Sequence, residues 1–278
     1  MRGALTPPGP LSTTALLAWR ELRFRLASVW FWAVSSATCL MAWLYGVGFL
    51  CSFRTESVIV TTDPLLALNA AVVIFLGLVL GLRLAAAMAW EREHRTLEVL
   101  LTGPVGWGAI IAAKFVVELA VLLLLVLIYA VYLAIAQPLG AGVIGPEELR
   151  GLALIPAFAL PVMALGLAVG AGSGTVRAAV VGFLILVGLL ALVEIARGIL
   201  SSQTVDQMSL ASLYLRHALD IAAPVLGLAS PATQLALPVQ SLALQVPLDL
   251  AQAGASLAQA AVLLLLAAGI GHLRGALR

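Results

Sequence analysis

Charged residues are scarce in this sequence. Only 10% of its 278 residues are Asp, Glu, Lys or Arg, and 63% are hydrophobic, whereas soluble domains contain about 25% charged residues. The mean hydropathy is +1.12. A chain this apolar has too little polar surface to face water, so the bilayer must be its main solvent. The sequence therefore predicts an all-α integral membrane protein, and its net charge of +2 gives no reason to expect nucleic acid as a partner.

Lysine is nearly absent. The one lysine, Lys114, stands between Ala113 and Phe115. A nucleotide-binding loop of the Walker type needs a Gly-Lys-Ser/Thr ending, because its lysine reaches the nucleotide phosphates. This excludes such a loop from the chain.

Cysteine and histidine are also rare. Cys39 and Cys51 are twelve residues apart, roughly 18 Å along a helix, which is too far for a disulfide or a compact metal site. His94, His217 and His272 are far apart and form no His-Glu-x-x-His motif, and no Gly-x-Ser-x-Gly motif occurs. We therefore expect no catalytic residue, no metal and no cofactor on this chain.

Six apolar stretches are long enough to cross a bilayer, which takes about 20 residues. The predicted spans are 29–50, 66–89, 109–136, 152–171, 178–196 and 250–271. The first begins after an arginine-rich segment and is too long for a cleaved signal, so we expect it to be retained. Residues 29–278 then form a single transmembrane domain, preceded by a tail and helix over 1–28. The linker 198–249 is apolar but broken by prolines, which predicts short helices at or dipping into the outer surface.

Basic residues are distributed unevenly between the two sides of these spans. If the N-terminus is cytoplasmic, ten lie on the inner side: Arg2, Arg20, Arg23, Arg25, Arg92, Arg95, Lys114, Arg177, Arg274 and Arg278. Four lie on the outer side: Arg54, Arg150, Arg197 and Arg216. Inner loops of membrane proteins carry the excess of Lys and Arg. The bias predicts a plasma-membrane (inner-membrane) protein with both termini in the cytoplasm.

The segment before the first span predicts an amphipathic interfacial helix. Apolar residues recur at helical spacing at Ala15, Trp19, Leu22 and Leu26, and the other faces carry Arg20, Glu21, Arg23 and Arg25. Such a helix lies in the headgroup layer, with Trp19 near the acyl boundary. It either only anchors the first span or also forms part of a dock for a cytoplasmic partner, and the segment itself favours neither.

The most polar internal segment lies between the second and third spans, from Trp90 to Leu101. As a short helix it would place Trp90, His94, Leu97 and Leu101 on one face and Glu91, Arg95 and Glu98 on a second, charged face. Thr102-Gly103-Pro104 would end it. By its composition this is either an ordinary charged loop or a rigid lever that moves both spans together.

The residue pattern of this segment favours the lever. The run is Glu91-Arg92-Glu93-x-x-Thr96-Leu97-Glu98-x-Leu100-Leu101-Thr102-x-Pro104-Val105, followed by Lys114-Phe115. It resembles the region between spans two and three of ABC transporter permeases of the type-2 exporter class, in the branch of the gliding-motility and copper-enzyme-maturation permeases. The opening Trp19-Arg20-Glu21-Leu22-Arg23 is similar to that family's entry helix.

The resemblance implies a permease that forms the translocation pathway of an exporter. Such permeases pair with a second copy or a homologous permease and with cytoplasmic ATP-binding subunits, which hold ATP and Mg. It also implies a short cytoplasmic coupling helix between spans two and three. The implied ATPase-coupling residues are Arg20, Glu21, Glu91, Arg92, Glu93, Arg95, Thr96, Leu97 and Glu98. The alternative is a membrane scaffold or force-transmitting subunit of such a complex that does not itself transport; an intramembrane enzyme is a third reading, for which no catalytic set is visible.

Three charged residues fall inside the predicted spans, namely Arg83, Lys114 and Glu118. Charges at bilayer depth are usually paired or functional. Lys114 and Glu118 share a helix face, and Arg83 could reach Glu118 across the hairpin of spans two and three. They either brace the two helices or contact substrate. A local pair is also expected between Glu194 and Arg197 in span five.

Glycines repeat at small-xxx-small spacing in two spans, at Gly77 and Gly81 and at Gly166, Gly170 and Gly174. This spacing lets helices approach closely. The close approach is expected within the chain, with a dimer interface as the alternative.

Overall fold

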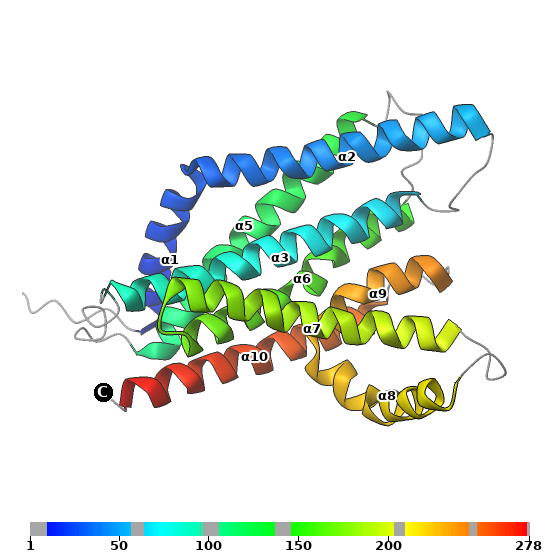
Figure 1. The fold of residues 1–278 in the computed structure, drawn as a ribbon. Helices are drawn as coiled ribbons and strands as arrows, with labels where there is room; N and C mark the ends of the chain where they lie inside the picture. Colours follow the sequence, from blue (N-terminus) through cyan, green and yellow to red (C-terminus); the bar gives the residue numbers. More distant parts are fainter. Residues whose placement is uncertain are drawn as a thin grey trace, which may run out of the picture.

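The computed structural model describes residues 10–56, 64–94, 96, 106–136, 146–202, 209–244 and 249–276. The regular elements in these ranges are all α-helices (Figure 1). They are α1 (Pro10–Leu26), α2 (Val29–Glu56), α3 (Pro64–Glu93), α5 (Trp107–Ala136), α6 (Pro146–Gly172), α7 (Val176–Ser202), α8 (Leu210–Ala229), α9 (Pro231–Leu244) and α10 (Leu250–Ala276).

Six of these helices are long and apolar enough to cross a membrane. The candidate spans are Val29–Gly48, Leu65–Glu93, Trp107–Ala136, Leu152–Gly172, Val176–Leu200 and Leu250–Arg274. Each overlaps one predicted stretch, so the prediction of an all-α membrane protein with six spans is confirmed. The first span ends a little earlier than predicted and the others extend by a few residues.

Local sequence explains where several helices begin. Proline stands at the first position of α1, α3, α6 and α9, where its missing N–H needs no partner. Hydroxyl side chains cap other helix starts. Thr175 accepts from the amide of Ala178 at 3.2 Å, and Ser28 accepts from the amide of Phe31 at 3.4 Å. Ala27 and Ser28 therefore form a break between α1 and α2.

The core is organised around α6, which packs most extensively against α3 and α10 (Figure 1). Glycines allow the close approach of α3 and α6. A Cβ atom on Gly166 would overlap the carbonyl oxygen of Gly81, and one on Gly170 would lie 2.6 Å from that of Ala85. Gly77, Gly81, Gly166 and Gly170 thus serve packing within the chain, as expected, whereas a Cβ on Gly174 would meet nothing within 4 Å.

The linker between spans five and six contains two short helices, as predicted. α9 packs among α3, α6 and α7 and buries Ala232, Gln234 and Leu235. α8 stays at the edge of the bundle, where Leu210 and Tyr214 are exposed. The broken linker therefore supplies one helix to the core and one to the periphery.

One expectation about the region after span two is corrected. Residues Glu91, Arg92 and Glu93 form the last turn of α3 and do not begin a separate helix. Glu and Arg are good helix formers, so the helix of span two continues past its apolar part. Arg95 and residues 97–105, which would complete the predicted coupling helix, lie outside the described residues.

Candidate functional site

Two charged residues of α1 turn toward the bundle. Glu21 Oε1 lies 3.4 Å from Lys114 Nζ, and Arg25 Nη2 lies 3.7 Å from Glu118 Oε1. Both pairs join α1 to α5. Glu21 and Arg25 are one helical turn apart, and so are Lys114 and Glu118. The two charges of α1 therefore face the two opposite charges of α5 in the same order along both helices.

Helix α3 contacts the same two residues of α5, Lys114 and Glu118, with charged side chains of its own. Glu91 Oε1 lies 2.5 Å from Lys114 Nζ, and Arg83 Nε lies 3.5 Å from Glu118 Oε1. The Arg83 guanidinium also stacks over the Trp30 ring of α2, at 3.6 Å from the ring centroid. The predicted contact between Arg83 and Glu118 is therefore present, and Lys114 and Glu118 each bridge α1 to α3.

These residues form one network of balanced charge. We call Glu21, Arg25, Arg83, Glu91, Lys114 and Glu118 the six-residue network; it has three positive and three negative side chains. The α5 members are the most deeply buried, with Lys114 side chain 5% and Glu118 side chain 1% exposed. Among the described residues, neither carboxylate oxygen of Glu118 accepts a hydrogen bond, so the ion-pair contacts with Arg25 and Arg83 are the close contacts that offset its burial.

A cavity of about 400 Å³ lies beside the network. Its lining is Glu21, Arg25, Arg83, Ala86, Ala87, Trp90, Glu91, Lys114 and Val176. Residues from α1, α3, α5 and α7 thus surround the same space. The packing between α1 and the bundle is looser here than between α3 and α6.

Arg92 and Glu93 bind the turn between α6 and α7. Arg92 Nη1 donates to the carbonyl oxygens of Ala171 at 2.8 Å and Ser173 at 3.1 Å, at the end of α6. Glu93 Oε2 accepts from the amide of Val176 at 2.9 Å, at the start of α7. A cation at a helix C-terminus and an anion at a helix N-terminus both suit the helix dipole. Together with the contact of Glu91 to α5, the end of α3 is tied to three other helices.

Of the expected charged face of the coupling segment, only Glu91 lies among the described residues. Glu91 points to Lys114 and does not lie on an exposed face. Trp90, expected on one helix face with His94, is 51% exposed and stacks on His94 with ring centroids 4.3 Å apart. Thr96 is exposed and donates to the carbonyl oxygen of Glu91 at 3.0 Å. Arg95, Leu97 and Glu98 lie outside the described residues.

The apolar residues of α1 lie in two different surroundings. Trp19 is 67% exposed, whereas Leu22 and Leu26 pack against the core. Arg20 and Arg23 are exposed, as expected, but Glu21 and Arg25 are not on the outward face. The inward roles of Glu21, Arg25 and Glu91 were missed. The matching four-residue spacing of Glu21 and Arg25 with Lys114 and Glu118 was the signal that could have indicated them.

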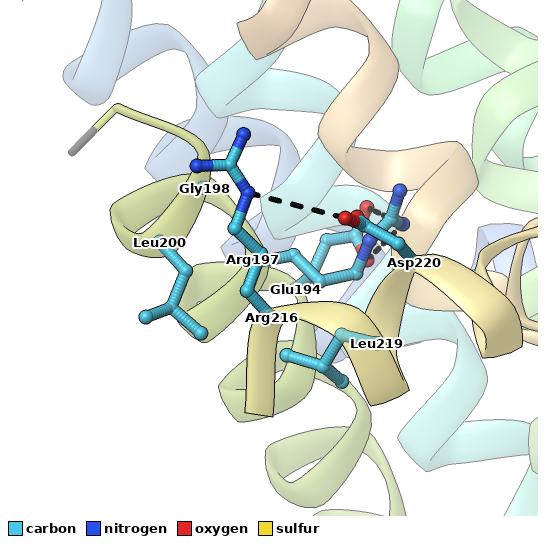
Figure 2. Close-up of a pocket in the computed structure, with 7 residues that line it drawn as sticks. All are labelled: Glu194, Arg197, Gly198, Leu200, Arg216, Leu219 and Asp220. Carbon is cyan, nitrogen blue, oxygen red and sulfur yellow. Dashed lines mark hydrogen bonds and ion pairs between the residues drawn. The ribbon is translucent and has the colours of Figure 1, made fainter. Parts of the chain in front are cut away.

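A second, smaller charged site lies between α7 and α8 (Figure 2). The predicted local pair is present, with Arg197 Nη1 3.3 Å from Glu194 Oε2. Arg216 Nε lies 3.9 Å from Asp220 Oδ2 on α8. These side chains line a cavity of about 140 Å³. Each of these two ion pairs lies within one helix, and the cavity lies where α7 and α8 meet.

The fold and the six-residue network define a multi-pass, all-α membrane protein. The buried charges of this network lie where α1 meets the bundle. The chain belongs to the ABC-2 transporter family: the model described as "ABC-2 family transporter protein" matches residues 15–270. It is thus a membrane permease of the ABC transporter class, which confirms the resemblance at the level of the family. No curated protein matches the chain.

Proposed function

We propose that this chain is the permease subunit of an exporter and forms half of its translocation pathway. A second copy or a homologous permease forms the other half. A separate cytoplasmic ATP-binding subunit, which holds ATP and Mg, drives the pair. The chain lies in the plasma membrane with both termini in the cytoplasm, in keeping with the excess of basic residues on that side.

The observation that carries this proposal is that α1 and the end of α3 meet in the six-residue network. The family match supports an ABC transporter permease. A permease driven by a separate subunit needs elements at one end of its bundle that pass a displacement to several spans. The network joins α1, α3 and α5, and Arg92 and Glu93 add α6 and α7.

The geometry suggests two roles for the proposed coupling residues. Arg20, Glu93 and Thr96 are exposed and can be reached by a partner, and Arg95, Leu97 and Glu98 are proposed to belong with them. Glu21, Glu91 and Arg92 contact other helices of the permease, so we assign them to transmission of the movement. Glu93 belongs to both groups, because it also accepts from the amide of Val176 on α7. Arg83, Lys114 and Glu118 receive it inside the spans.

The test is reconstitution with a cytoplasmic ATP-binding-cassette protein, and one encoded beside this chain would be the first choice. The two should co-purify, and in proteoliposomes the permease should raise or regulate ATP hydrolysis and support ATP-dependent movement of a compound out of the cytoplasmic compartment. Absence of a stable complex would contradict the proposal. Coupled hydrolysis without movement of any compound in a broad screen would favour the non-transporting, force-transmitting alternative.

The isolated permease should neither bind nor hydrolyse ATP, because its one lysine is paired with Glu91 and Glu21 and stands in no phosphate loop. Nucleotide binding to purified chain, free of partners, would be measured by equilibrium dialysis. The complex with the ATPase is the positive control. Stoichiometric binding by the permease alone at micromolar ATP would contradict the assignment of ATP to a partner.

A further inference from the structure

We propose that α1 can dock on the bundle and separate from it. Glu21 and Arg25 attach the helix to the bundle. Its separation leaves no charge of the six-residue network unpaired. This inference concerns the permease chain by itself. It goes beyond the proposed function and does not depend on the identity of the driving subunit.

The charges of the network divide into two neutral halves. The bundle half pairs Lys114 with Glu91 and Glu118 with Arg83, and all four stay on α3 and α5. The α1 half consists of Glu21 and Arg25. These two are four residues apart with the glutamate first, the order in which an i,i+4 pair stabilises its own helix. Since breaking a buried pair is strongly unfavourable when it leaves a lone charge, this division removes the main obstacle to separation.

The bundle half is supported without α1. Lys114 is closer to Glu91, at 2.5 Å, than to Glu21, at 3.4 Å. Arg83 is held by Glu118 on one side and stacks over Trp30 on the other. Lys114 and Glu118 are nearly inaccessible, whereas Glu21 and Arg25 side chains are 34% and 23% exposed. The contacts made by α1 are therefore the longer and more exposed ones in the network.

The packing around α1 leaves room for movement. The cavity of about 400 Å³ is lined by Glu21 and Arg25 on one side and by bundle residues on the other. Among the α1 side chains that the structure describes, Leu22 and Leu26 pack against the core and are only partly buried. The chain breaks between α1 and α2 at Ala27 and Ser28, and Ser28 caps α2 separately. The helix can thus rotate about this break while α2 stays in place.

The experiment measures the position of α1 in the full-length chain in lipid nanodiscs. Spin labels at Phe24→Cys on α1 and Leu273→Cys on α10, both exposed positions, report the docking distance by double electron–electron resonance. Labels at Leu189→Cys on α7 and Leu266→Cys on α10 report the integrity of the bundle. Both pairs are placed in a Cys39→Ser, Cys51→Ser background. The parent should give one narrow docking distance.

Reversing the α1 half, with Glu21→Arg and Arg25→Glu, keeps opposite charges four residues apart and the same net charge but opposes like charges across the interface. The docking distance should lengthen by roughly one helical turn, about 5 Å or more, while the bundle distance stays unchanged. Glu21→Gln with Arg25→Gln, a milder change, should broaden the docking distance. The matched control exchanges the pair on α7, with Glu194→Arg and Arg197→Glu, and should change neither distance.

Three results would overturn the proposal. The first is a docking distance that the reversal leaves unchanged. The second is a bundle distance that changes together with the docking distance, because α1 would then not be separable. The third is failure of both α1 variants to yield folded protein, since the proposal requires the bundle half to stand without α1.

Discussion

At the scale of single residues, Glu118 is a buried charge that needs oppositely charged partners. Its carboxylate is almost fully buried, inside a candidate span, and lies within 3.7 Å of Arg25 and 3.5 Å of Arg83. Burial of a charged carboxylate is costly, and each arginine contact offsets part of that cost. Arg83 is further oriented by Trp30, so the contact on the α3 side is the more fixed of the two.

Arg83 and Glu118 should be energetically coupled. Arg83→Leu or Glu118→Leu alone should each destabilise the chain by about 3 kcal/mol, because each leaves a buried charge without its main partner. The double variant should cost less than the sum by ~1–2 kcal/mol. Unfolding in mixed detergent micelles measures all four states. The same cycle on Glu194 and Arg197, a local pair, should give a coupling below about 1 kcal/mol. Strict additivity at Arg83 and Glu118 would contradict the pairing.

The sequence predicted the contact of Arg83 and Glu118 because charges stand out within apolar runs and the two spans are consecutive. It did not predict the partners on α1. Lys114 and Glu21 are 93 residues apart, and their contact depends on how α1 folds back onto α5. The amphipathic pattern placed the charges of α1 on its outward faces, whereas tertiary packing turns Glu21 and Arg25 inward. Periodicity identifies a helix but cannot choose among faces that are all partly polar.

At the scale of elements, α3 contacts several other helices, and its apolar pattern alone does not indicate these contacts. One of its faces lies against α6 through glycines, and its last turn contacts α5, α6 and α7. Small-xxx-small spacing made the glycine contact predictable. The capping roles of Arg92 and Glu93 were not predictable from the sequence, because they depend on where the α6–α7 turn lies in space.

The close approach of α3 and α6 should not tolerate a methyl group at Gly166. Gly166→Ala would place its Cβ against the carbonyl oxygen of Gly81. We expect a loss of ~1–3 kcal/mol from overpacking. Gly188→Ala on α7, where the Cβ would meet nothing within 4 Å, is the matched control. It should be neutral or gain up to about 0.5–1 kcal/mol, since alanine favours the helix. Thermal unfolding of both variants measures the difference, and equal behaviour would disprove the steric argument.

Removing the Glu93 carboxylate should loosen the start of α7. Glu93→Ala leaves the amide of Val176 without its acceptor. Loss of a charge-assisted hydrogen bond of ~1.4 kcal/mol should speed its hydrogen exchange about tenfold. Arg177→Ala is the control, because it removes an exposed neighbouring charge and leaves the bond of Val176 intact. Exchange at Val176 that is equal in the parent and Glu93→Ala would show that the cap does not stabilise this turn.

At the scale of the whole molecule, the two ends of the bundle differ in kind. One end gathers α1, the last turn of α3, the α6–α7 turn and the end of α10 (Figure 1). It holds the six-residue network and many of the basic residues. Toward the other end lie α8 and α9. The described contacts there include an uncharged buried hydrogen bond, donated by Tyr129 to Asn69 at 2.8 Å, and the local ion pairs of α7 and α8. This polarity agrees with a permease that receives force at one end of its bundle.

The same polarity predicts how the chain is oriented in its membrane. Both α1 and the end of α10 lie at the basic end, and six spans return the chain to its starting side. Because cytoplasmic segments carry the excess of Arg and Lys, this end should face the cytoplasm. Single cysteines at Arg23→Cys and Leu273→Cys should then be protected, in intact cells, from a maleimide that cannot cross membranes. Tyr214→Cys on the exposed side of α8 should be labelled. All three should react after the membrane is permeabilised, which controls for burial. Labelling of Leu273→Cys in intact cells, or protection of Tyr214→Cys there but not after permeabilisation, would show that the six-span, cytoplasmic-termini arrangement is wrong.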